Sequence, residues 1–192
     1  MKKRIFALAV VMICLSILAS TTLAYFTDAA IARNVVTSGG VDIAIEEWQK
    51  TPNGLVPYPG QPITVMPATS VSKIVTVRNR DAQCFIRAKL NFTLKDADGK
   101  EMEISSEVLE QIIHLAMNSS DWTEKNGWWY YGSTVDTDEV TKPLMTGVSF
   151  DGPNMTNEYQ NCTVTIDVTA QAVQAANNAA SALEAQGWPE TE

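Results

Sequence analysis

The chain has 192 residues, 22 of them acidic and 14 basic, and its formal net charge is −8. This length suits one domain with a hydrophobic core, and the acidic excess disfavours binding to nucleic acid or to anionic lipid. The sequence contains no nucleophile elbow, phosphate-binding glycine loop or dinucleotide fingerprint. We therefore expect a single domain without a cofactor.

The first 24 residues predict a cleavable secretory signal peptide. A basic stretch, Lys2-Lys3-Arg4, precedes the apolar run from Ile5 to Leu18, and Thr22-Leu23-Ala24 is a suitable cleavage site before Tyr25. The run is shorter than the roughly 20 residues of a membrane-spanning helix, although an uncleaved anchor is the alternative. Cleavage would leave residues 25–192 with eleven basic and 22 acidic residues, a charge of −11. We expect this product to be secreted or held at the cell surface.

Moderate strand signals come first in the remaining chain. Apolar residues alternate with other residues between Val41 and Glu46, and β-branched residues are frequent between Val71 and Arg78. Five prolines between Thr51 and Pro67 predict a loop with extended pieces.

The two clearest strands run from Cys84 to Leu94 and from Cys162 to Ala172. In both, the even-numbered residues are apolar and the odd-numbered ones are polar, with Phe85 as the exception. This period of two predicts strands with one buried face. Each segment begins with an inward cysteine, and two cysteines in an exported chain indicate a disulfide between Cys84 and Cys162, with two buried thiols as the alternative.

A helix is predicted to begin at Ser105 or Ser106. Glu107 favours its positive end, and one face carries the apolar residues Val108, Leu109, Ile112, Ile113 and Ala116. Shorter strands are expected at 128–131 and 148–150, and residues 175–187 of the Ala-rich tail, 175–192, can form a second helix. Together these elements predict a mainly β fold, an antiparallel β-sandwich of jelly-roll type with one or two short helices.

The sequence offers few candidates for catalysis or metal binding. His114, the only histidine, falls inside the predicted helix and is interpreted as a surface or boundary residue. Acidic residues cluster at 96–101 and at 136–139, but neither group fits the twelve-residue calcium loop, so we interpret both as turns. The aromatic run 128–131 can serve as a carbohydrate platform or, for its inward half, as core. We expect no catalytic residue, no metal site and no enzymatic activity.

The residues around the cleavage site resemble the start of the TasA/camelysin family. The matching stretches are 23–28, Leu-Ala-Tyr-Phe-Thr-Asp, and 34–43, which ends in Gly-Gly-Val-Asp-Ile. The resemblance continues through residues 66–79, 85–90, 128–131 and 163–174. Members of this family are exported Gram-positive proteins that are processed by a dedicated type I signal peptidase of the SipW kind.

The resemblance implies a jelly-roll subunit of an extracellular biofilm-matrix fibre. In the TasA branch, the N-terminal segment that processing frees adds as a strand to the next subunit. The corresponding segment here is 25–36, in which the assembly residues would be Tyr25, Phe26, Ala30, Ile31, Val35 and Val36. The expected partners are further copies of the chain, the signal peptidase and an anchoring or accessory matrix protein.

Two other interpretations stay open on the sequence. In one, the chain is a monomeric secreted protein whose N-terminal strand pairs within its own sheet. In the other, it is a cell-surface metalloprotease, an activity described for camelysins, although the sequence lacks a recognisable zinc-binding motif.

Overall fold

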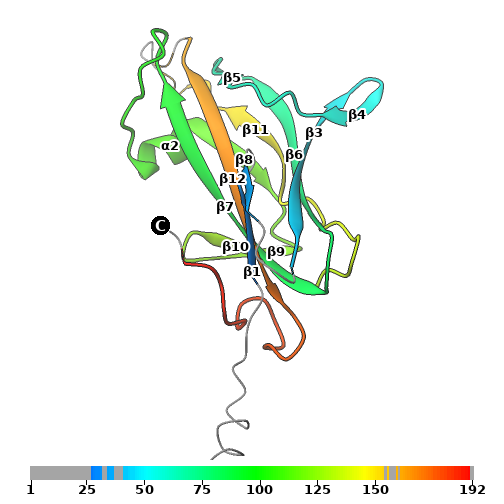
Figure 1. Cartoon of the computed structure of the whole chain (residues 1–192). Coiled ribbons are helices and arrows are strands. Elements are labelled where there is room, and N and C mark those ends of the chain that lie inside the picture. Colours follow the sequence, from blue (N-terminus) through cyan, green and yellow to red (C-terminus); the bar gives the residue numbers. More distant parts are fainter. Residues whose placement is uncertain are drawn as a thin grey trace, which may run out of the picture.

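The computed structural model describes residues 27–31, 34–36, 41–153, 155, 159 and 161–190. Two antiparallel β-sheets lie face to face, with one short described helix at their side (Figure 1). The predicted antiparallel β-sandwich is thus confirmed. The described helix is too short and too polar to cross a membrane.

The first sheet has the strand order β2-β1-β12-β7-β10-β9, and β5 also pairs with β12. The bounds are β1 Thr27–Ile31, β2 Asn34–Val36, β5 Ile63–Thr64, β7 Cys84–Lys95, β9 Trp122–Lys125, β10 Trp128–Tyr131 and β12 Thr163–Gln174. The second sheet has the order β4-β3-β6-β11-β8. Its bounds are β3 Ile43–Thr51, β4 Gly54–Pro57, β6 Ser70–Asn79, β8 Ile113–Met117 and β11 Met145–Phe150.

The centre of the first sheet is the long ladder between β7 and β12, the two strands with the strongest alternation. They pair over their whole length, from Cys84 opposite Gln174 to Lys95 opposite Thr163. The alternation predicted the inward face correctly, because even-numbered residues such as Ile86 and Val164 are fully buried in the main core. Residues of β6, β8 and β11 from the second sheet complete that core.

The helix α2, Ser106–Ile112, is shorter than predicted. Ser105 caps it, accepting a hydrogen bond from the Val108 N–H at 3.4 Å. From Ile113 the chain continues as β8 and pairs with β11, so the prediction of a helix through Ala116 was wrong. The apolar residues have helical spacing, but pairing with β11 stabilises this stretch as a strand. Tertiary contacts commonly override such a local helical preference.

The tail also differs from its prediction. Residues 175–190 form turns and irregular structure rather than a second helix. The Asn178 side chain organises these turns, because its amide donates to the carbonyls of Gln174 and Gln186, both at 3.1 Å. The tail covers an apolar patch on the outer face of the first sheet, where Phe85 and Val173 are buried with Ala182 and Ala185. Phe85 therefore interrupts the alternation because the tail covers it.

Candidate functional site

The N-terminal strands form a hairpin at one side of the first sheet. Strand β1 pairs with β12, from Thr27 opposite Val173 to Ile31 opposite Thr169, and β2 folds back onto β1. Among the described strands, β2 is the outermost of this sheet, so one five-residue ladder joins the hairpin to the sandwich.

The predicted assembly residues are thereby only partly located. Four of them, Ala30, Ile31, Val35 and Val36, belong to this hairpin. The predicted cleavage site, Ala24 and Tyr25, lies outside the described residues, and so does Phe26.

The sandwich is open on the other side of β7. There β10 pairs with β7 only at Arg87 and Ala88, and Glu101 forms a bridge with Lys95. In the described part of the chain, no strand pairs with this edge between Lys89 and Thr93.

The even-numbered residues of β7 direct their peptide groups to this open side. Cys84 exchanges both backbone hydrogen bonds with Val135 there, and the Leu94 carbonyl accepts from the Met102 N–H at 2.9 Å. Because the direction alternates along a strand, Leu90 and Phe92 also present their N–H and C=O groups to the open edge.

A groove of about 720 Å³ follows this open edge, between β7, α2, β8 and the β9–β10 hairpin. We call it the β7–β8 groove. Among the described strands, β8 is the last of the second sheet, so in this part of the chain both sheets have an unpaired edge beside the groove. Its apolar lining consists of Leu90, Phe92, Leu109, Ile113, Leu115 and Trp129, and its polar residues include Lys89, Glu110, His114 and Glu124.

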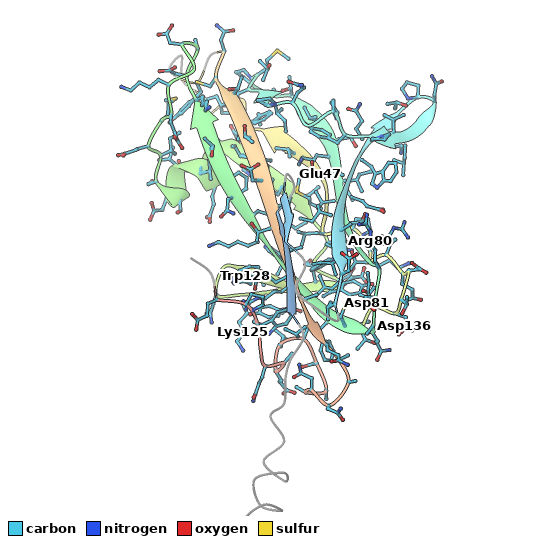
Figure 2. All side chains as sticks on the ribbon, viewed as in Figure 1. Glu47, Arg80, Asp81, Lys125, Trp128 and Asp136 are labelled. Carbon is cyan, nitrogen blue, oxygen red and sulfur yellow. The ribbon has the colours of Figure 1, made fainter. Side chains whose placement is uncertain are left out.

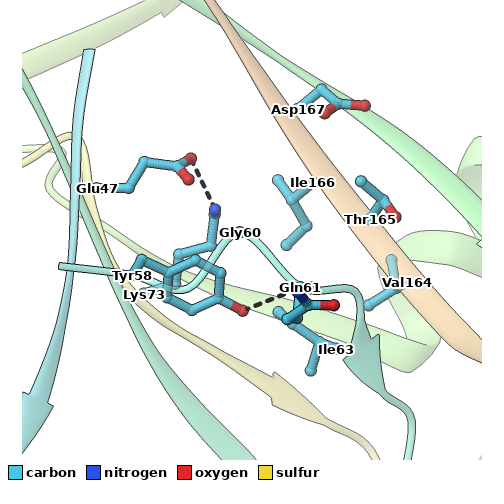
Figure 3. Close-up of a pocket in the computed structure, with 10 residues that line it drawn as sticks. All are labelled: Glu47, Tyr58, Gly60, Gln61, Ile63, Lys73, Val164, Thr165, Ile166 and Asp167. Atoms are coloured by element: carbon cyan, nitrogen blue, oxygen red, sulfur yellow. Dashed lines mark hydrogen bonds and ion pairs between the residues drawn. The ribbon is translucent and has the colours of Figure 1, made fainter. Parts of the chain in front are cut away.

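A smaller cavity, of about 80 Å³, lies between β12 and the β3–β6 pair (Figure 3). The Lys73 Nζ atom lies 2.7 Å from Glu47 Oε1, and the two side chains are 4% and 17% exposed. The same Nζ atom lies 4.2 Å from the centre of the Tyr58 ring. Burial, and secondarily the charge of Glu47, raise the pKa of Tyr58. Lys73 on β6 is thus paired with Glu47 on β3 and lies against the Tyr58 ring, so the cluster links neighbouring strands of the second sheet.

The aromatic run of β10 is divided between the two faces of the sheet. Trp129 and Tyr131 pack against the main core, and Tyr130 packs against the cluster beneath the tail. On that outer face, the Arg87 guanidinium lies 4.2 Å from the Trp128 ring centre. The run is therefore mostly engaged in packing, although Trp129 also lines the β7–β8 groove.

The predicted disulfide between Cys84 and Cys162 is wrong. Neither residue forms a disulfide, and both are fully buried. Cys84 lies opposite Gln174 at one end of the β7–β12 ladder, whereas Cys162 precedes Thr163 at the other end. At about 3.3 Å per residue, roughly 35 Å separates them. Both side chains point inward as predicted. However, a common inward direction does not place two residues at the same height, because antiparallel strands run in opposite directions.

His114 lies on a strand, and the acidic residues of both clusters lie in or beside turns. His114 lies on β8, exposed, with its Nε2 atom 3.5 Å from Asp151 Oδ2. The Asp96 carboxylate accepts from the backbone N–H groups of Asp98 and Lys100, as expected of a turn. Asp136 lies with Arg80 and Asp81 toward one end of the sandwich (Figure 2). Within the described ranges, no group of three His, Cys, Asp or Glu residues could hold a metal ion.

Sequence reasoning missed the hairpin that closes one end of the groove. Asn126 and Gly127 connect β9 to β10 with φ angles of 55° and 78°. An Asn-Gly pair between two strands is a strong hairpin signal, because both positions require positive φ. The open edge had no comparable signal. The alternation at Leu90 and Phe92 predicts that their side chains are buried, but it does not predict whether a further strand pairs with β7 there.

Comparisons with known proteins do not place the chain in a family. No family model matches it, and no curated protein matches it. Among solved structures, it is similar to the AfaE-3 adhesin from Escherichia coli, with 14% identity, 71% of this chain and 96% of that chain covered, and a TM-score of 0.28. A likeness this weak carries no argument about function.

Proposed function

We propose that this chain is a secreted, non-enzymatic structural protein, a subunit that assembles head to tail into an extracellular matrix fibre through its N-terminal strands. The observation that carries the proposal is the position of the β1–β2 hairpin. It lies at the side of the first sheet, and among the described strands β12 is the one strand of the sandwich that pairs with it.

Such a hairpin is suited to exchange between copies. Its pairing with β12 uses backbone hydrogen bonds, which the sheet edge of another copy can also supply. A contact between different surfaces of successive copies does not close on itself, so it propagates into a filament. Because the hairpin follows directly after the predicted cleavage site, processing by the signal peptidase would release it for pairing.

The test compares two purified proteins by electron microscopy, residues 25–192 and residues 37–192. We expect filaments from the first and dispersed particles from the second. Circular dichroism checks that the shorter protein is folded. Filaments of the shorter protein would contradict assembly through the N-terminal strands.

A monomeric secreted protein is the second candidate, and the pairing of β1 with β12 of the same chain favours it. The two candidates differ in which chain supplies the strand. Cysteines placed at Ile31 and Thr169, which lie opposite each other, would form a disulfide within one chain in a monomer.

A further inference from the structure

We propose that the β7–β8 groove is the acceptor site for assembly, and that it binds the N-terminal segment of a second copy, residues 27–36, as a strand added to the open edge of β7. This inference rests on the proposed function, which supplies the head-to-tail contact between copies. The inference identifies the surface of the second copy that receives the strand.

The edge of β7 selects an extended peptide. Leu90 and Phe92 direct their N–H and C=O groups toward the groove, over a stretch, Lys89 to Thr93, with no described strand beside it. Peptide groups at a sheet edge are satisfied by a peptide in the strand conformation, which pairs with them as a further strand. The apolar lining favours a segment with apolar side chains on at least one face.

Strand β1 matches this edge in length, and the N-terminal segment matches it in charge. The open stretch spans five residues, from Lys89 to Thr93, and β1 is a strand of five residues. Segment 27–36 contains one acidic residue, Asp28, and one basic residue, Arg33, in a chain that is acidic as a whole. It therefore avoids repulsion from Glu110 and Glu124 at the groove.

The arrangement of the strands requires the segment to come from another copy. Strand β1 lies on one side of the β12–β7 pair, and the groove lies on the other. A chain's own hairpin, while paired with β12, is separated from its own groove by these two strands. Donor and acceptor thus lie on opposite sides of one molecule, the geometry that gives an open head-to-tail chain.

Disulfide trapping between two differently labelled chains tests the site. One preparation of residues 25–192 carries a single new cysteine at position 28, 29, 30 or 31 in turn, which covers both faces of the strand. It is mixed with a second that carries Asn91→Cys, on an exposed residue of the open edge, or Thr169→Cys, opposite β1 on β12. Because each chain has one new cysteine, a donor–acceptor disulfide joins two copies. Unsubstituted protein controls for the buried native cysteines.

We expect donor–acceptor disulfides with Asn91→Cys and none with Thr169→Cys. Disulfides with Thr169→Cys alone would show that neighbours exchange β1 onto β12, which overturns the groove as acceptor but leaves assembly intact. Disulfides with neither acceptor in protein that forms filaments would also overturn it. Absence of both disulfides and filaments would overturn the proposed function as well.

A matched pair of charge substitutions gives a second readout. Leu115→Glu places a carboxylate in the groove. The control, Leu55→Glu, places the same group on β4, where Leu55 is 59% exposed and does not line the groove. We expect Leu115→Glu to lower the filament yield at least tenfold and Leu55→Glu to leave it unchanged. Equal yields from two folded variants would contradict the site.

Discussion

The Arg87 guanidinium lies 4.7 Å from the centre of the Trp188 ring and so joins the middle of β7 to the tail of the chain. It also donates to the Pro189 carbonyl at 3.3 Å and to the Gln171 side chain at 2.7 and 2.9 Å. A planar cation can stack and form hydrogen bonds at the same time, which an ammonium group cannot do in the same way. Arg87 thus holds the tail over the apolar patch at Phe85 and Val173.

Replacing Arg87 by alanine is therefore expected to loosen the tail. The loss of the stacking and of the hydrogen bonds to the buried Gln171 should destabilise the fold by about 2 kcal/mol. Limited proteolysis should cut within 175–190 faster than in the unsubstituted protein. Arg87→Lys should behave like alanine, and Arg80→Ala, at an exposed arginine, is the control. Unchanged cleavage in Arg87→Ala would contradict this role.

The buried ion pair between Lys73 and Glu47 predicts a double-substitution result. Lys73→Met alone leaves the Glu47 carboxylate unpaired in a site where it is 17% exposed, and should cost about 3 kcal/mol in the free energy of unfolding. Adding Glu47→Leu removes that charge and should restore stability to within about 1 kcal/mol. Urea denaturation of the single and double variants measures both values. A double variant less stable than the single one would show that the pair itself is favourable.

Tyr58 predicts a loss of stability in alkaline solution. Burial raises the pKa of its hydroxyl in the folded state, so the neutral form is favoured by folding. The corresponding stabilisation is complete below the unfolded-state pKa of about 10 and declines as the pH rises through the higher folded-state pKa. Tyr58→Phe should therefore lose less stability than the unsubstituted protein above about pH 10. Parallel curves for the two proteins would exclude Tyr58 as the cause.

The separation of Cys84 and Cys162 predicts a simple thiol titration. Burial, and secondarily the charge of Asp96, raise the pKa of the Cys162 thiol, which lowers its reactivity in the folded protein. Residues 25–192 should show little reaction with a thiol reagent when folded and two reactive thiols when unfolded without reductant. The melting temperature should not depend on reductant. A count of zero in the unfolded protein would restore the disulfide.

The sequence predicted those parts of the fold that depend on local patterns. Alternation from Cys84 and from Cys162 identified β7 and β12 and the face that each buries, because a period of two follows directly from strand geometry. The same pattern could not predict their register, which fixes the distance between the cysteines. At Ile113 the helical spacing continued, but pairing with β11 formed a strand instead. The groove was not predictable because it depends on where β10 stops pairing with β7.

Electron microscopy of residues 25–192 beside residues 37–192 distinguishes assembly through the N-terminal strands from a monomeric protein. We expect filaments of the longer protein and none of the shorter, although both are folded. Filaments of residues 37–192, or dispersed particles of residues 25–192 at every concentration, would contradict assembly through these strands.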